Sequence, residues 1–328
     1  MTSDTITLVK VDLTIADRWA VGTWSDADAT IQLPVLRDPR ASAGERPYLP
    51  ATSLVGALRR HLRDRLGVAL TEEWLGPEPT GYEQRTGTLD DDRLGRLVVL
   101  GCLPIDAAVR VRGATAVDGE RGAASGTTMR TEQWVEPTTA TLVAFHDGPR
   151  DATLLAELAR WTPTVGRSRT GGLGRARASA VASVELDLTQ TEHLDWWLAR
   201  RDGWLRGAQP PRGLQPRTEP IPDPGLVAGQ RWALVAAEPI HVGVDKNGVR
   251  QEEGGRAAPT LDSVGRLLVP GASWKGVFRH RTRVILRAAG ASEIETDALV
   301  TALFGGEKNR GRLTFRDSVA TDAAPQKR

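Results

Sequence analysis

A loop of glycine and arginine is the strongest chemical motif in this sequence. Residues 164–177 read TVGRSRTGGLGRAR, without the GxxxxGK[ST] order of a Walker loop. Glycines let a backbone approach a ligand closely, and guanidinium groups form paired hydrogen bonds with phosphates. We therefore expect the loop to bind a nucleic-acid backbone; the alternative is an ordinary exposed arginine-rich turn. The expected contact residues are Gly166, Arg167, Arg169, Gly171, Gly172, Gly174 and Arg175.

A second motif, Pro-X-X-Ser-X-X-Gly-X-X-Arg, occurs twice. It begins at Pro50 in YLPATSLVGALRRHLRDRL (48–66) and at Pro270 in LVPGASWKGVFRHRTRVIL (268–286). The apolar spacing predicts a helix after each Pro, with Thr52 or Ser53 near the first cap. Free N–H groups and the dipole at a helix start favour phosphate, although ordinary capping with a solvated basic face is the alternative. The expected contact residues are Ser53, Arg59, Arg63, Ser273, Lys275, Arg279 and Arg283.

These two motif copies belong to a longer internal repeat. The segment VDLTIADRWAVG (11–22) alternates like WALVAAEPIHVG (232–243), and WLG (74–76) followed by GRL (95–97) matches LFG (303–305) followed by GRL (311–313). Four landmarks in the same order indicate a duplicated domain. Six prolines between 210 and 224 predict an extended connector. We therefore expect a complete domain over 1–186, a helical tail and Pro-rich linker over 187–228, and the amino-terminal half of a second domain over 229–328.

The elements that position these motifs follow from periodicity. The chain opens with a period-two strand, and further strands are expected at 95–101 and 176–188, with a short amphipathic helix at 151–161. This order predicts an α+β fold, an antiparallel sheet with helices on one face. Four tryptophans are expected to pack the first domain against its helical tail, namely Trp161, Trp196, Trp197 and Trp204.

Composition excludes several protein classes. The chain has 328 residues and a net charge of +2, and only five of its 43 basic residues are Lys. No apolar run approaches the ~18 residues of a membrane span, and the amino terminus lacks a signal-peptide pattern, so we expect a cytoplasmic protein. A single cysteine, Cys102, allows no internal disulfide or multi-cysteine zinc site and is expected to be a small buried hydrophobe. The five histidines lack metal-site spacing.

In order and combination, these motifs resemble the RAMP superfamily of CRISPR-associated proteins, specifically a tandem backbone subunit of type III effector complexes. LPATSLVGALR and VPGASWKGVFR look like the family's Pro-Gly-Ser-Ser-Leu-Lys-Gly helix, and VGRSRTGGLGRAR resembles its glycine-rich loop. LPVLRDP (33–39), the two Gly-Arg-Leu strands and Val111 to Pro137 also fit, so the resemblance covers most of the chain.

The resemblance implies ferredoxin-like domains, similar to RNA recognition motifs, with a β-hairpin thumb inserted. It also implies that the protein binds guide RNA (crRNA) and target RNA alongside other effector subunits. Such a subunit serves antiviral defence and needs no cofactor or membrane.

The sequence departs from the family pattern in two places. Catalytic backbone subunits have an acidic residue two positions before the Pro of the LPVLRDP segment, but Gln32 stands there and cannot bind a hard cation as a carboxylate does. We therefore expect no catalysis in the first domain. Val55 also replaces the family's basic residue in the first helix, whereas Lys275 keeps it in the second.

Two other functions stay open. One is a metal-dependent endoribonuclease that cleaves target RNA with Mg²⁺. Its candidate carboxylates are Asp26, Asp28, Asp245, Glu252, Glu253 and Asp262. The other is an adaptor that contacts only protein, which predicts that arginine changes in the glycine-rich loop leave RNA affinity unchanged.

Overall fold

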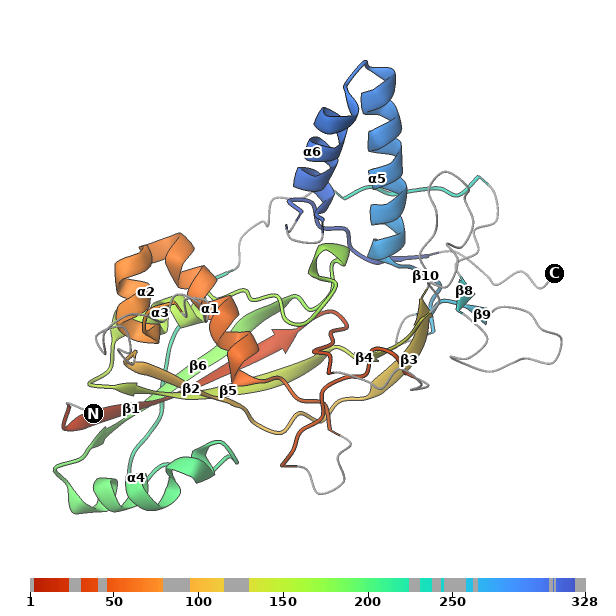
Figure 1. Cartoon of the computed structure of the whole chain (residues 1–328). Helices are drawn as coiled ribbons and strands as arrows, with labels where there is room; N and C mark the ends of the chain where they lie inside the picture. Colours follow the sequence, from red (N-terminus) through yellow and green to blue (C-terminus); the bar gives the residue numbers. More distant parts are fainter. Residues whose placement is uncertain are drawn as a thin grey trace.

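A five-stranded antiparallel sheet forms the centre of the first repeat (Figure 1). Its strands, in spatial order, are β2 (Leu97–Cys102), β5 (Thr138–Asp147), β1 (Thr5–Ile15), β6 (Ala176–Asp187) and β7 (Arg217–Thr218). The computed structural model describes residues 3–23, 31–40, 46–78, 95–114, 130–223, 231–237, 243–244, 258–261, 265–306, 309 and 311–321. Strands β2 and β6 confirm the strands that the sequence predicted at 95–101 and 176–188.

Three helices cover one face of this sheet, α1 (Ala51–Leu66), α2 (Val68–Leu75) and α3 (Ala152–Ala159). The leucines of α1 at positions 54, 58 and 62 are all buried, because a spacing of four residues keeps them on one side of a helix. They share a core with alternate residues of β1, from Val9 to Ile15. The predicted helix starts differ, since α3 is capped by the Asp151 side chain but α1 begins after Pro50 without a side-chain cap. Thr52 and Ser53 lie in the first turn of α1, near the cap as expected, and neither side chain caps the helix.

The chain runs through the sheet as strand, helix pair, strand, strand, helix and strand, with order β2-β5-β1-β6. This is the ferredoxin-like βαββαβ arrangement, and it confirms the predicted α+β class. A hairpin of β3 (Val109–Ala114) and β4 (Arg130–Val135) is inserted between β2 and β5. The predicted hairpin insertion is therefore present, and its tip at 115–129 lies outside the described residues.

The helical tail covers the second face of the sheet, which differs from the expectation of helices on one face only. Helix α4 (Thr191–Trp204) packs Trp196, Trp197 and Trp204 against the residues of β1 that alternate with the α1 core. The expectation for these three tryptophans is confirmed, because indole rings shield sheet surface that would otherwise face water. Trp161 instead joins the core beneath α1, so its predicted contact with the tail is wrong.

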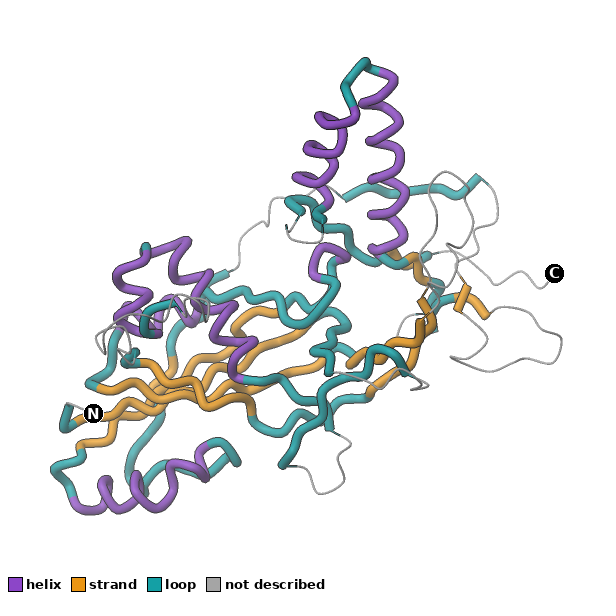
Figure 2. The backbone as a smooth tube through the Cα atoms, in the orientation of Figure 1, coloured by secondary structure: helices purple, strands orange, loops and turns teal. Residues whose placement is uncertain are grey.

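The second repeat consists mainly of α5 (Gly271–Ala288) and α6 (Glu293–Phe304), which lie outside the five-stranded sheet (Figure 2). Two short strand pairs accompany them. These are β8 (Gly243–Val244) with β9 (Ala258–Pro259), and β10 (Leu268–Val269) with β11 (Ser318–Val319).

The repeated sequence landmarks adopt the same local geometry in both repeats. A Cβ at Gly95 would lie 2.3 Å from Gly76 N, and a Cβ at Gly311 would lie 2.5 Å from Gly305 N, so both positions require glycine. The residue after each glycine makes the equivalent hydrogen bond in both repeats. Arg96 N donates to Glu73 O, and Arg312 N donates to Ala302 O, at 3.1 Å each. These shared contacts match Gly95 with Gly311 and Arg96 with Arg312. None of the helices in the described part of the chain is long and apolar enough to span a bilayer.

Candidate nucleic-acid interface

The glycine–arginine loop connects α3 to β6 and packs against the segment after β1. Arg167 N donates to Ala20 O at 2.9 Å. A Cβ at Gly166 would stand 2.2 Å from Ala20 O, and one at Gly174 would stand 1.9 Å from Val165 O. Both glycines have positive φ, +75° and +70°, which side-chain-bearing residues rarely adopt. These two predicted site residues therefore shape the loop.

The guanidinium of Arg167 points into the protein, beneath the hairpin. Its Nη2 donates to Gln133 O at 2.7 Å and to Leu33 O at 3.1 Å. Its centre lies 4.6 Å from the centre of the Trp134 ring, a cation–π contact. Arg167 thus links the loop, the LPVLRDP segment and β4, and this ties up donors that were expected to reach phosphate.

Arg175 is also engaged, since it donates to both carboxylate oxygens of Asp17 at 2.6 and 2.9 Å. Arg169 and Arg177 are the exposed arginines of the loop. Arg169 begins a short 3₁₀ turn (η3, Arg169–Gly171) at the loop tip. Of the predicted loop arginines, Arg169 is therefore the one whose charge faces solvent.

The loop tip contacts the start of α5 in the second repeat. Lys275 Nζ donates to Thr170 Oγ1 at 2.8 Å, and Phe315 N donates to Thr170 O at 3.1 Å. A Cβ at Gly171 would lie 3.7 Å from Ala272 N, an ordinary contact. The two motifs that the sequence singled out, whose contacting residues Thr170 and Lys275 are 105 positions apart, thus meet at one junction.

Glycine is required on both sides of this junction. A Cβ at Gly172 would lie 2.3 Å from Phe315 O, and a Cβ at Gly271 would lie 2.2 Å from the same oxygen. The Gly271 Cβ would also stand 2.6 Å from Gly171 O. The first repeat has Ala51 where the second has Gly271, so the start of α1 lacks the space that the start of α5 provides.

A carboxylate occupies the first turn of α5. Asp317 Oδ1 accepts from Gly271 N at 2.8 Å, and Oδ2 accepts from Arg18 Nη2 at 2.9 Å. The expected phosphate cradle at this helix start is therefore already filled at Gly271 by a side chain of the protein. Burial and the charge of Arg18 lower the pKa of the nearby Arg112.

The cations of α5 that were expected to bind RNA differ in their environments. Burial and then the charge of Arg279 lower the pKa of Lys275, so these two cations lie close together beside the loop tip. Arg279 makes no hydrogen bond or ion pair within the described residues. Arg283 donates to Asp297 on α6 at 2.8 Å. Ser273 lies in the first turn, where its N–H donates to Pro270 O.

The predicted residues on α1 are occupied by contacts within the first repeat. Arg59 donates at 2.8 Å to the carbonyl oxygens of Leu75 and Gly76, which the end of α2 leaves without helical partners. Arg63 pairs with Glu78. Ser53 N donates to Pro50 O at 3.1 Å. Arg59 therefore caps a neighbouring helix, a role that periodicity does not reveal.

Gln32, at the position of the family's acid, binds the hairpin. Its Oε1 accepts from Thr131 N at 2.6 Å, next to the bridge between Leu33 and Glu132. An amide therefore provides a structural contact at the position where the resemblance implied a carboxylate in catalytic subunits.

The candidate catalytic acids Asp26, Asp28, Asp245, Glu252, Glu253 and Asp262 all lie outside the described residues. Within those residues, no cluster of three His, Cys, Asp or Glu side chains is arranged to hold a metal ion. Cys102 is buried at the end of β2, as expected, and burial raises the pKa of its thiol to about 12.

Sequence reasoning missed a second arginine anchor. Arg40 pairs with Asp38 at 2.9 Å, and the same guanidinium donates to Cys102 O at 2.8 Å and to Leu205 O at 3.3 Å. It therefore joins the LPVLRDP segment to β2 and to the end of α4. Asp38 stands between Arg37 and Pro39 in that segment and is buried. An acid followed closely by Arg40 is the sequence signal for this ion pair.

Comparison with known proteins connects the second repeat to a family. Residues 234–325 match the model of the RAMP superfamily. None of the curated proteins matches. Two solved structures show distant likeness, both of a type III-B Cmr-beta complex. One, bound to cognate target RNA, has a TM-score of 0.40 and 14% identity, and covers 55% of this chain and 61% of that chain. The other, an apo state, has a TM-score of 0.40 and 11% identity, and covers 52% of this chain and 95% of that chain. This chain thus spans less than two thirds of the first structure's chain.

The family match confirms the predicted resemblance to the RAMP superfamily over the second repeat. It includes the helix that begins after Pro270 and the LFG and GRL landmarks. The first repeat has the same local contacts at these landmarks and a ferredoxin-like sheet.

Proposed function

We propose that this chain is a guide-RNA (crRNA)-binding backbone subunit of a type III CRISPR effector complex. It acts in the cytoplasm in antiviral defence, beside other effector subunits and the target RNA. Sequence specificity comes from base pairing, while the protein holds the RNA backbone. The proposal includes no cofactor.

The observation that carries the proposal is the junction of the glycine–arginine loop with α5. Helix α5 lies within the residues that match the RAMP superfamily model. Three cations from two repeats gather there: exposed Arg169 on the loop, and Lys275 and Arg279 on the helix. Clustered cations on facing elements suit a flexible polyanion, since each phosphate contact releases a counterion. Strand β3 of the hairpin meets the same junction through Arg112, beside Arg18 and Asp317.

RNA retention tests this proposal. The chain is purified with the products of its operon neighbours, and any bound RNA is extracted and sequenced. We expect RNA with a common repeat-derived end. Arg169→Ala with Arg279→Ala should weaken binding and reduce the slope of log Kd against log salt by about 1.4, since each single-strand phosphate contact contributes about 0.7. The matched control is Arg200→Ala with Arg212→Ala, two exposed arginines outside the junction.

The same preparation separates the other functions. An unchanged affinity and salt slope in the junction variant would contradict the proposal and favour a protein-only adaptor. Cleavage of a complementary RNA with Mg²⁺, abolished by Asp245→Ala or Asp262→Ala but not by Gln32→Ala, would instead make this chain a nuclease.

A further inference from the structure

Asp317 joins the two repeats through one carboxylate. Its Oδ1 accepts from the N–H of Gly271, the first residue of α5, and its Oδ2 accepts from Arg18 Nη2, at 2.8 and 2.9 Å. Arg18 belongs to the segment after β1, and its carbonyl oxygen accepts from Gly174 N in the glycine–arginine loop at 2.9 Å. The carboxylate therefore lies where the first repeat, the second repeat and that loop meet.

Several cations lie around this carboxylate. Burial, and then the charge of Arg18, lower the pKa of Arg112 on β3. The charges of Asp317 and Glu132 oppose that shift. Arg316, the residue before Asp317, is exposed beside the loop. Cations crowded in a partly buried place repel one another unless an anion lies among them. Asp317 supplies part of that negative charge.

A carboxylate held by a backbone N–H and a guanidinium has the contacts of a bound phosphate, because both groups present anionic oxygens to the same donors. The side chains of Arg18 and Asp317 are 15% and 22% exposed, so one edge of the pair faces solvent. Within the described part of the chain, the buried Nε of Arg112 has no hydrogen-bond partner. Asp317 thus occupies donors that a phosphate of RNA would otherwise use, next to a guanidinium with a donor left over.

Only the side chain of Asp317 has to rotate to release these donors. The backbone on both sides is held, since Phe315 N donates to Thr170 O at 3.1 Å and Ser318 pairs with Val269 between β10 and β11. Ion pairs that reach solvent contribute little to stability, so an incoming anion can replace this carboxylate without unfolding the junction.

We propose that Asp317 is an autoinhibitory contact, which fills the place of one RNA phosphate beside Arg18 and Arg112 until RNA displaces it. The inference rests on the proposed binding of RNA at this junction. A phosphate that belongs to RNA brings its neighbours to the other cations of the junction, so it outcompetes one carboxylate, whereas a small free anion gains a single contact. The contact therefore makes the junction selective for a continuous polyanion.

Asp317→Asn tests the displacement. The full chain, washed free of nucleic acid at high salt, is titrated into a fluorescein-labelled single-stranded RNA of mixed sequence, and fluorescence anisotropy gives Kd. The amide keeps the size of the side chain and can still accept from Gly271 N, but it carries no charge to hold Arg18. We expect about fivefold tighter binding, because RNA no longer has to replace an ion pair. Asp317→Ala should show the same gain, which guards against a folding defect in one variant.

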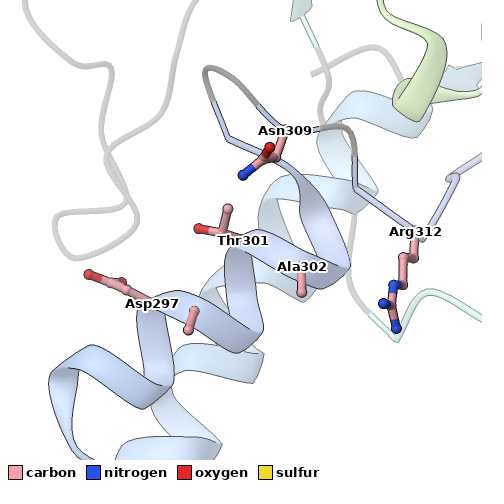
Figure 3. A pocket seen from close by; sticks show the side chains of 6 residues that line it. Asp297, Thr301, Ala302, Asn309 and Arg312 are labelled. Carbon is pink, nitrogen blue, oxygen red and sulfur yellow. The ribbon is translucent and has the colours of Figure 1, made fainter.

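Asp297→Asn is the matched control. Asp297 lines a hollow on α6, with Arg312 at the other side (Figure 3), and it accepts from Arg283 of α5 at 2.8 Å. This variant removes the same charge from another arginine pair, outside the contact at Asp317, so RNA affinity should change by less than about twofold. An equal gain in both variants would mean that net charge alone sets the affinity, and would overturn the proposal.

A double-mutant cycle on RNA affinity shows whether Arg18 is the shared partner. Arg18→Ala should weaken binding about fivefold more in the Asp317→Asn background than in the native chain, where Arg18 must first leave Asp317. Equal losses in both backgrounds would overturn displacement at Arg18. RNA binding by the native chain without any gain in Asp317→Asn and Asp317→Ala would overturn this inference alone. If none of these proteins bound RNA, the proposed function would fall with it.

Discussion

The opening segments of the two repeats alternate alike and have opposite environments. In the first repeat this segment begins in the central strand of a sheet, where Val11, Leu13 and Ile15 are buried, whereas in the second repeat residues 232–235 are exposed beside α5. The short landmarks behave differently. Each helix starts after a Pro, and each Gly-Arg-Leu begins with a glycine packed on the backbone at the end of the preceding helix.

The difference separates two kinds of sequence information. Backbone packing at a glycine depends on residues a few positions away, so it forms with or without a complete sheet. Burial of an alternating segment depends on strands that are distant in the sequence. A motif match therefore identifies the local helix and glycine contacts. It does not show whether the alternating segment nearby is buried, because that depends on strands elsewhere in the sequence.

The largest expected effect tests this contrast in the core. Leu13→Ala should lower the free energy of unfolding of the first repeat by about 2–5 kcal/mol, because it leaves a cavity between β1 and α1. Leu234→Ala, at the aligned position in the second repeat, should change the free energy of unfolding of the protein by less than about 0.5 kcal/mol. Urea unfolding followed by circular dichroism measures both. Equal losses would mean that Leu234 is buried in the isolated protein.

Cysteine labelling compares Cys102, the last residue of β2, with Ser318 in β11, which the Gly-Arg-Leu landmarks place at the matching position. Cys102 is buried, and its raised pKa of about 12 leaves little thiolate, whereas Ser318 aligns with it and is exposed. In a Cys102→Ser background, Ser318→Cys should react with iodoacetamide at pH 8 at least about a hundredfold faster than native Cys102, which requires local opening. Similar rates would contradict the difference in burial between the repeats.

A smaller effect is expected for the ion pair that joins the repeats. Arg18 and Asp317 are partly buried at 15% and 22% exposure, so a double-mutant cycle with Arg18→Ala and Asp317→Ala should give a coupling of about 1 kcal/mol. The exposed pair of Arg63 and Glu78 within the first repeat should couple more weakly. A coupling of zero for Arg18 and Asp317 would show that the junction opens in solution.

The smallest effect is a pH dependence within the first repeat. Burial, followed by the charge of Arg96, lowers the pKa of His146 below its ordinary 6.5, although the charge of Asp151 opposes the shift. The unfolded chain therefore binds a proton first, so this contribution is present above pH 6.5 and is lost as the pH falls through the folded-state pKa.

His146→Leu should reduce the loss of urea stability between pH 7.5 and pH 5. A slope remains, because burial also lowers the pKa of His61. An identical slope in the variant and the native protein would contradict a role for His146.

The elements of the first repeat were predictable, because period-two and helical spacing report burial directly. The roles of the arginines were not predictable. Arg59 and Arg167 bind backbone carbonyl oxygens, and a guanidinium accepts a carbonyl or a phosphate as partner with the same donors. The sequence predicted the loop and the helix start as one RNA-binding unit, and the structure shows that the loop tip contacts the start of α5. The sequence did not predict that Asp317, almost 50 residues after Gly271, occupies the first turn of α5.

The contact between the loop tip and α5 joins two units of one polypeptide. A covalent connection of this kind gives the contact an effective concentration in about the millimolar range, so an association too weak to hold two separate proteins is formed nearly all the time. The order and spacing of the two units are then fixed during translation.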